Sequence, residues 1–217
     1  MEFVENDNIK LILFEVSKDI ILPNFKNLKS SHVYYKNNKD IVTKVDIEVE
    51  NYLEKKLTKI INNSYFIGEE KFTTKPEIMN YYNENNYCWT VDPIDGTSNF
   101  VKGKKEFAVM ISLSFLNKII QSWIYKPITN EFMYAKISEG TFLNNKRIYV
   151  KNTKLLSDCV GSISSKYWKD DFEYKINILK SNFKKINSYG SIGCEYFDIA
   201  LGFRDFAILS RLYPWDH

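Results

Sequence analysis

The chain has 217 residues, of which 44% are apolar and 16% aromatic, and its 30 Lys and Arg residues nearly balance 27 Asp and Glu residues. This composition excludes a disordered chain, and the length suits one large domain or two tightly joined halves. The net charge of +3 is too small to indicate a nucleic-acid partner.

The cysteines and histidines argue against a thiolate or imidazole metal site. Cys88, Cys159 and Cys194 are far apart and odd in number, which is typical of reduced thiols in a cytoplasmic protein. With only His32 and His217 present, we expect any metal to be held by oxygen. The acidic N-terminus does not resemble a signal peptide, and no apolar run approaches the ~20 residues that span a bilayer.

Two amphipathic helices are predicted near the N-terminus. Apolar residues at helical spacing predict a helix over 8–22, interrupted or kinked at Pro23, and a polar stretch over 30–42 predicts a loop. A second apolar face runs over 45–61. Thr43 is placed to cap this helix and Asp46 to complete a capping box, so capping is the first interpretation of Asp46.

Two acidic segments follow. In 64–70 a short apolar strand leads through a glycine to Glu69 and Glu70. Taken alone, such an acidic pair is typical of a solvated turn. The polar segment 71–86 predicts a loop or a loop with a short helix. In 89–100 an apolar strand ends at Asp92, and Asp95 follows three residues later. Both carboxylates should therefore emerge at one edge of the sheet, where they could hold a cation.

The remaining chain shows two different patterns of predicted secondary structure. Alternating apolar residues over 107–148 predict an antiparallel meander. From about residue 155, a strand over 159–164, a helix over 170–179, a strand or turn reaching Tyr189, a helix around 196–201 and a strand over 205–209 predict an α/β region. We therefore expect an α+β half over 1–150 and a smaller α/β half over 151–217.

The acids that follow the strands indicate phosphate chemistry. Mg²⁺ prefers carboxylate and carbonyl oxygens, and two such ions can together activate a water and stabilise a leaving oxygen. The candidate ligands are Glu69, Asp92, Asp95 and Asp216. Gly96 allows close approach of an anion, and the amides of Gly96 and Thr97 at a helix start would donate to phosphate. Phosphate ester hydrolysis is the reaction that these residues favour.

Three motifs resemble those of the inositol monophosphatase family of magnesium-dependent, lithium-sensitive phosphomonoesterases. They are Gly68-Glu-Glu70, Asp92-Pro-Ile-Asp-Gly-Thr97 with Asn99-Phe100, and Trp215-Asp216, in the family's order and spacing. The segment 40–46 and Gly190-Ser191 also match. The resemblance implies a layered αβαβα sandwich, often a homodimer, acting on a small phosphorylated metabolite such as a polyol or sugar-like phosphate.

The resemblance also implies roles for individual residues. Glu69, Asp92 and the Ile94 carbonyl would hold one Mg²⁺, and Asp92, Asp95 and Asp216 a second. Glu70 would lie behind these ligands without binding Mg²⁺ itself. Asp46 and Thr97 would orient or deprotonate the attacking water, so that Asp46 combines capping with a catalytic contribution. Ser191 and Ile192 would contact substrate, whereas Arg204 and Arg211 are expected to face solvent.

Two departures from the family pattern bear on substrate and activity. Leu209, beside Ser210, stands where the family has its inositol-reading acid, although Ser98-Asn99-Phe100 is closer to the inositol-type enzymes than to the nucleotide-directed ones. Family members continue past the Trp-Asp pair, so Asp216 is expected to lack an orienting helix, with a weakened second metal site and reduced turnover. A histidinol-phosphate or nucleotide-bisphosphate phosphatase, and a truncated member that acts by binding, are the alternatives.

Overall fold

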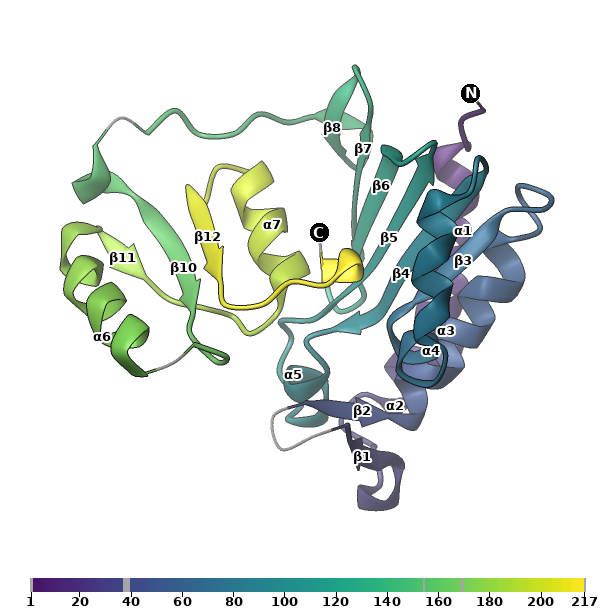
Figure 1. The fold of residues 1–217 in the computed structure, drawn as a ribbon, viewed down its shortest axis with the longest axis horizontal. Helices are drawn as coiled ribbons and strands as arrows, with labels where there is room; N and C mark the ends of the chain where they lie inside the picture. Colours follow the sequence, from purple (N-terminus) through teal and green to yellow (C-terminus); the bar gives the residue numbers. More distant parts are fainter. Residues whose placement is uncertain (1, 37–39, 154, 169, 217) are drawn as a thin grey trace.

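The computed structural model describes residues 2–36, 40–153, 155–168 and 170–216. Two sheets organise the chain (Figure 1). The larger is antiparallel except for its first pair, β3 and β4, which run parallel. Its seven strands are, in spatial order, β3 (Tyr65–Gly68), β4 (Tyr87–Asp95), β5 (Ala108–Phe115), β6 (Lys118–Lys126), β7 (Glu131–Lys136), β8 (Gly140–Leu143) and β9 (Lys146–Arg147).

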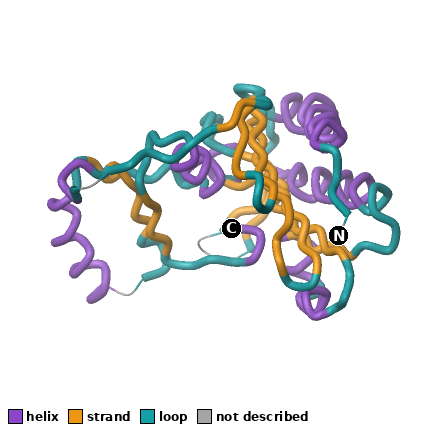
Figure 2. Tube along the Cα trace, turned by 90° about the horizontal axis from the view of Figure 1, so that it is seen from above, coloured by secondary structure: helices purple, strands orange, loops and turns teal. Residues whose placement is uncertain are grey.

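The smaller sheet is parallel and has the order β11 (Lys185–Ile186), β10 (Val160–Ser164), β12 (Phe206–Leu209). Helix α7 (Ile192–Ala200) lies between the two sheets, where it contacts β5, β6 and β12. Helix α6 (Asp170–Leu179) lies on the outer side of the smaller sheet, as Figures 1 and 2 show. With α1 (Asn6–Val16) and α3 (Lys44–Leu57) on the far face of the larger sheet, the predicted αβαβα layering is confirmed.

The main core fills the space between α1, α3 and the larger sheet. Its largest fully buried members include Trp89, Trp123 and Phe107. The first helix passes at Ser17–Ile21 into a π-helical turn and continues into α2 (Leu22–Asn24). The interruption predicted at Pro23 therefore takes the form of a π-helical turn before this proline and the end of the helix one residue after it. No helix of the described residues is long and apolar enough to cross a membrane.

The predicted capping box at the start of α3 is present. The Thr43 hydroxyl accepts from the amide of Val45 at 3.1 Å, and the Thr43 amide donates to Asp46 Oδ2 at 2.8 Å. Because these bonds satisfy backbone groups that the first turn leaves open, they fix both the start of the helix and the direction of the Asp46 carboxylate.

Two local predictions were wrong. The loop expected over 30–42 contains a 3-10 turn, Ser30–His32, and an antiparallel ribbon of β1 (Val33–Tyr35) and β2 (Ile41–Thr43). Its β-branched and aromatic residues favour strands, which the polar residues between them obscured. The acidic pair after Gly68 begins helix α4 (Glu69–Thr74) rather than a solvated turn, and a 3-10 helix, Pro76–Asn83, follows it.

A break in the pleat of β4 places both acids of the central motif on one face. Trp89 and Val91 point into the main core, so Asp92 points to the opposite face, toward α7. In a regular strand Asp95, three residues on, would return to the core side. The register with β5 shifts between Asp92 and Asp95, which brings Asp95 to the same side as Asp92.

Candidate active site

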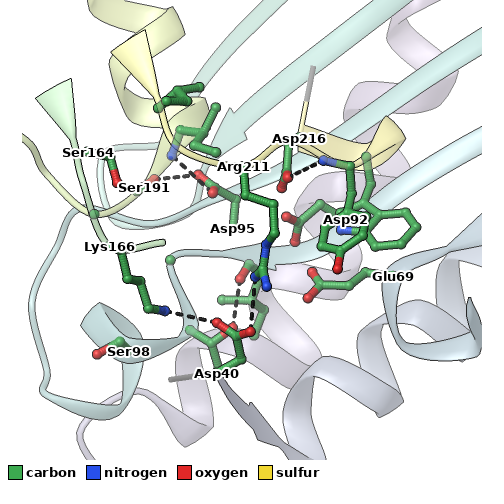
Figure 3. A pocket seen from close by; sticks show the side chains of 18 of the residues that line it. Asp40, Glu69, Asp92, Asp95, Ser98, Ser164, Lys166, Ser191, Arg211 and Asp216 are labelled. Carbon is green, nitrogen blue, oxygen red and sulfur yellow. Dashed lines mark hydrogen bonds and ion pairs between the residues drawn. The ribbon is translucent and has the colours of Figure 1, made fainter. Parts of the chain in front are cut away.

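A pocket of about 420 Å³ lies at the ends of β4, β10 and β12 and at the start of α7. Its size suits a small metabolite. Figure 3 shows carboxylates from four separate parts of the chain directed into it. Of the predicted site residues, those that line it are Glu69, Asp92, Ile94, Asp95, Gly96, Thr97, Ser191, Ile192 and Asp216. Two others, Asp46 and Glu70, lie behind this lining, Asp46 against Thr97 and Glu70 beside Lys36.

Asp92 has the most unfavourable environment of these acids. Its side chain is 3% exposed, and its Oδ1 is buried without a hydrogen-bond partner among the described residues. Burial, followed by the charges of Glu69, Asp95 and Asp216, raises the pKa of Asp92 well above its usual value. A buried carboxylate oxygen without a donor is costly unless a cation or donor meets it, so this atom fits a metal ligand.

Glu69 and Glu70 are positioned by the start of α4. The amides of Glu70 and Lys71 donate to the buried Glu50 carboxylate at 2.7 and 2.8 Å. Lys36, from the β1–β2 ribbon, reaches both acids, with its Nζ 2.8 Å from Glu69 and 2.9 Å from Glu70. Burial lowers the pKa of Lys36, but the charges of Glu69 and Glu70 outweigh it and raise the pKa above its usual value. The acidic pair is thus already matched to a positive charge.

Asp95 is held by the N-terminus of α7. Its oxygens accept from the Ser191 hydroxyl and from the amides of Ile192 at 3.0 Å and Gly193 at 2.7 Å. A carboxylate at a helix N-terminus is favoured by the open amides and the helix dipole. Even so, burial raises the pKa of Asp95 to about 7. Ser191 and Ile192, predicted to contact substrate, line the pocket while they position Asp95.

Asp216 was expected to lack the helix that orients it in the family, and in this structure it is held by a short turn instead. It ends a 3-10 turn, Pro214–Asp216, and its Oδ2 accepts from the Tyr213 amide at 2.7 Å. Trp215 is 6% exposed and packs against Phe72, with ring centroids 5.1 Å apart. The buried neighbour anchors the turn, and burial raises the pKa of Asp216 to about 6.

Thr97 joins the pocket to Asp46. Its hydroxyl lies 2.9 Å from Asp46 Oδ1 and 3.0 Å from the Ile94 carbonyl, either of which can accept its proton. Gly96 makes this turn possible because its φ is +91° and a Cβ there would lie 3.0 Å from Ser191. Asp46 is 1% exposed, and burial raises its pKa to about 6. Its carboxylate meets the pocket lining through the hydroxyl of Thr97.

The carboxylates share a pocket but do not form a closed metal cage. Within the described ranges no three acidic, histidine or cysteine side chains converge on one point closely enough to hold an ion. The contacts above account for this, since Lys36 engages Glu69, α7 engages Asp95 and Tyr213 engages Asp216. The donor set, all oxygen, and the partnerless Asp92 oxygen fit Mg²⁺ chemistry.

Sequence reasoning missed several residues of the site. Glu50 lies four residues after Asp46 on the buried face of α3. A second acid at that spacing on an otherwise apolar helix face is a pattern from which Glu50 could have been identified as a site residue. Lys36, Asp40 and Lys166 lie in polar segments that carry no such signal.

The two arginines expected in solvent are engaged by the protein. Arg204 is 3% exposed and donates to the Asn187 carbonyl at 2.6 Å. Arg211 lines the pocket and binds Asp40 at 2.9 Å.

Comparison of the chain with known proteins identifies related sequences. A model of the inositol monophosphatase family matches residues 6–217. An inositol monophosphatase of Dictyostelium discoideum is 33% identical over 225 residues, which cover 100% of this chain and 81% of that protein. A fructose-1,6-bisphosphatase/inositol-1-monophosphatase of Thermotoga maritima is 30% identical over 179 residues, which cover 82% of this chain and 65% of that protein.

Solved structures have the same fold. An inositol monophosphatase of Thermotoga maritima superposes with a TM-score of 0.81 at 27% identity, covering 97% of this chain and 78% of that one. An inositol monophosphatase/NADP phosphatase complexed with Mg²⁺ and phosphate has a TM-score of 0.82 at 21% identity, covering 97% and 76%. Because the family model spans nearly all of it, the chain belongs to the inositol monophosphatase family and is a phosphoric monoester hydrolase of that type.

Proposed function

We propose that the chain hydrolyses the phosphomonoester of a small polyol or sugar with the help of Mg²⁺. The observation that carries this proposal is the buried Asp92 oxygen without a donor among the described residues, in a pocket whose lining also includes the carboxylates of Asp40, Glu69, Asp95, Glu195 and Asp216. Membership of the family and a solved structure of the same fold that holds Mg²⁺ and phosphate support it.

The residues that would hold Mg²⁺ are Glu69, Asp92, Asp95, Asp216 and the Ile94 carbonyl. When bound, Mg²⁺ supplies Lewis acidity toward the phosphate and lowers the pKa of a coordinated water. Lys36 meanwhile matches the charge of the Glu69 and Glu70 pair, so the ammonium and an entering ion compete for Glu69. Lys36 would therefore have to release Glu69 before that carboxylate could serve as a ligand.

Thr97 and Asp46 would orient the attacking water and take its proton. When the Thr97 hydroxyl donates to Asp46, its lone pairs face the pocket and can accept an O–H of water. As that water attacks phosphorus, the bond from phosphorus to the ester oxygen breaks, the proton of the water passes to Thr97 and the Thr97 proton passes to Asp46. The departing alkoxide takes a proton from solvent and leaves as the alcohol. The amides of Gly96 and Thr97, at the start of helix α5 (Thr97–Val101), would donate to the phosphate.

Three features of the whole protein remain predictions. A homodimeric state is inferred from the family resemblance, a cytoplasmic location from the number and spacing of the cysteines, and a division of the chain near residue 150 from the change in its sequence pattern.

The test is phosphate release by the purified chain from inositol 1-phosphate, histidinol phosphate and nucleotide bisphosphates, with and without Mg²⁺. We expect Mg²⁺-dependent release from at least the polyol or sugar phosphates, and its loss in Asp92→Asn. Release that is undiminished in EDTA, or in Asp92→Asn, contradicts the proposal. Calorimetry with Mg²⁺ then separates a chain that binds the ion without turnover from one that does not bind it.

A further inference from the structure

Glu195 is a buried acid that belongs to the pocket lining but not to the proposed Mg²⁺ ligands. It lies in the first turn of α7 and is 1% exposed. A buried carboxylate is costly unless donors meet it, so the groups that donate to Glu195 indicate what it holds in place.

Three neutral groups donate to the Glu195 carboxylate. Its Oε1 accepts from the Ser188 hydroxyl at 2.7 Å and from the Tyr189 amide at 2.8 Å. Its Oε2 accepts from the hydroxyl of Ser162, a fully buried residue of β10. Because Ser188 and Tyr189 precede α7 in the chain, this one side chain joins the helix, the turn before it (188–191) and the smaller sheet.

The turn before α7 is also held by further hydrogen bonds. The Ser188 hydroxyl oxygen accepts from the Gly190 amide at 3.1 Å while the hydroxyl donates to Glu195. From α5, Asn99 Nδ2 donates to the Tyr189 carbonyl at 2.8 Å. Glu195 and Asn99 thus engage the amide and the carbonyl of Tyr189, which fixes where the chain enters α7.

Asp95 depends on the same end of α7. The Ser191 hydroxyl caps the helix by accepting from the Cys194 amide at 3.3 Å, and it donates to Asp95 (Figure 3). The Ile192 and Gly193 amides donate to Asp95 as well. A displacement of the turn would therefore move these three donors of Asp95 together.

We propose that Glu195 is a positioning residue, which anchors the turn before α7 and thereby holds the Asp95 carboxylate in place as a ligand of Mg²⁺. The role of Mg²⁺ rests on the proposed function, whereas the anchoring of Asp95 does not. Glu195 acts through its hydrogen bonds, so a neutral side chain of the same length can replace it. In Glu195→Gln the side-chain oxygen can accept from Ser188 and Tyr189, and the NH₂ group can donate to the Ser162 hydroxyl oxygen.

The test compares Glu195→Gln with Glu195→Leu, whose side chain is of similar size but neither donates nor accepts a hydrogen bond. Calorimetry measures the affinity of each variant for Mg²⁺. We expect Glu195→Leu to weaken Mg²⁺ binding about tenfold to a hundredfold, because loss of a group that orients a metal ligand has effects of this size, and Glu195→Gln to keep the affinity within about threefold.

The matched control is Asp205→Ala. Asp205 also accepts from a backbone amide, that of Val160 at the start of β10, at 2.7 Å, and from the hydroxyl of Thr153. It is not among the described residues that line the pocket. Both Glu195→Leu and Asp205→Ala should lower stability in urea unfolding, but only Glu195→Leu should weaken Mg²⁺ binding.

A second measurement needs no ion. In EDTA, hydrogen exchange of the Ile192 and Gly193 amides should be about tenfold faster in Glu195→Leu and little changed in Glu195→Gln. If Glu195→Leu does not fold, Ser188→Ala removes the hydroxyl between Glu195 and Gly190 and should move both measurements in the same direction by a smaller factor.

An unchanged Mg²⁺ affinity in Glu195→Leu, or in Ser188→Ala where the leucine variant does not fold, overturns the inference. Equal losses in Glu195→Gln and Glu195→Leu overturn it too, because charge rather than hydrogen bonding would then be responsible. If the wild type binds no Mg²⁺, the proposed function fails and hydrogen exchange alone decides the anchoring. Faster exchange of the Ile192 and Gly193 amides in the leucine variant then supports it, and unchanged exchange contradicts it.

Discussion

Replacement of Gly68 by alanine should disrupt the site without direct contact with substrate. Gly68 has an extended backbone, with φ −116° and ψ 149°, so alanine fits the chain itself. A Cβ there would lie 2.7 Å from Glu50 Oε1 and closer still to Oε2 and Cδ. Glu50 must therefore withdraw from the start of α4.

The cost follows from the two hydrogen bonds that Glu50 would lose, to the amides of Glu70 and Lys71. A hydrogen bond to a charged group contributes about 1.5–3 kcal/mol, and water can reach these half-buried amides. We therefore expect Gly68→Ala to lower the free energy of unfolding by about 2–4 kcal/mol. Because Glu69 begins the same helix, kcat/KM should fall by about tenfold or more.

A double-mutant cycle in urea unfolding tests the mechanism. In a Glu50→Ala background nothing opposes the new methyl group, so Gly68→Ala should cost less than about 1 kcal/mol. In a Glu50→Gln background the side chain keeps its length, and the large cost should remain. Equal costs of Gly68→Ala in the wild-type and Glu50→Ala backgrounds would refute the reasoning.

Three further outcomes are expected. Burial raises the pKa of the Asp92 carboxyl, so Asp92→Asn, which removes this buried group, should stabilise the protein in EDTA by about 1–2 kcal/mol, increasingly as pH rises. The same substitution should abolish the rise in Tm that Mg²⁺ induces. An unchanged rise in Tm contradicts the role of Asp92 as a ligand. Thr97→Val should lower kcat about 10²-fold or more while Thr97→Ser retains most of it, and an active valine variant excludes the relay. Burial raises the pKa of the Cys88 and Cys194 thiols to about 12, so at pH 8 a thiol reagent should modify Cys159 alone until the protein is unfolded, whereas several fast thiols contradict the burial.

The sequence predicted the parts of the site that depend on local pattern. The capping box of α3 and the meander of the larger sheet follow from spacing alone, because period and capping chemistry act over a few residues. The motif at Asp92 and Asp95 was expected at a sheet edge, and both carboxylates line one pocket. The shift of register that brings them to one face falls at Pro93, and proline within a strand is found at such bulges, so this residue was the available signal.

Contacts between distant segments were not predictable in this way. Asp40 meets Lys166 and Arg211 across 126 and 171 positions of the chain. Such pairs depend on how the ribbon and the smaller sheet are placed in space, which no local periodicity encodes. A solvated surface position is the default expectation for each of these residue types, so their meeting at the pocket had to come from the structure.

The pattern of hydrogen bonds separates one acid from the rest. Most buried carboxylates of the site have a backbone donor that offsets part of their desolvation, as in Asp46, Glu50, Asp95 and Asp216. Asp92 is as deeply buried, yet its Oδ1 has no donor among the described residues. A fixed donor at that atom would lower the cost of burial but would compete with any cation. The fold therefore leaves unmatched the one oxygen at which binding of a positive ion recovers the most free energy.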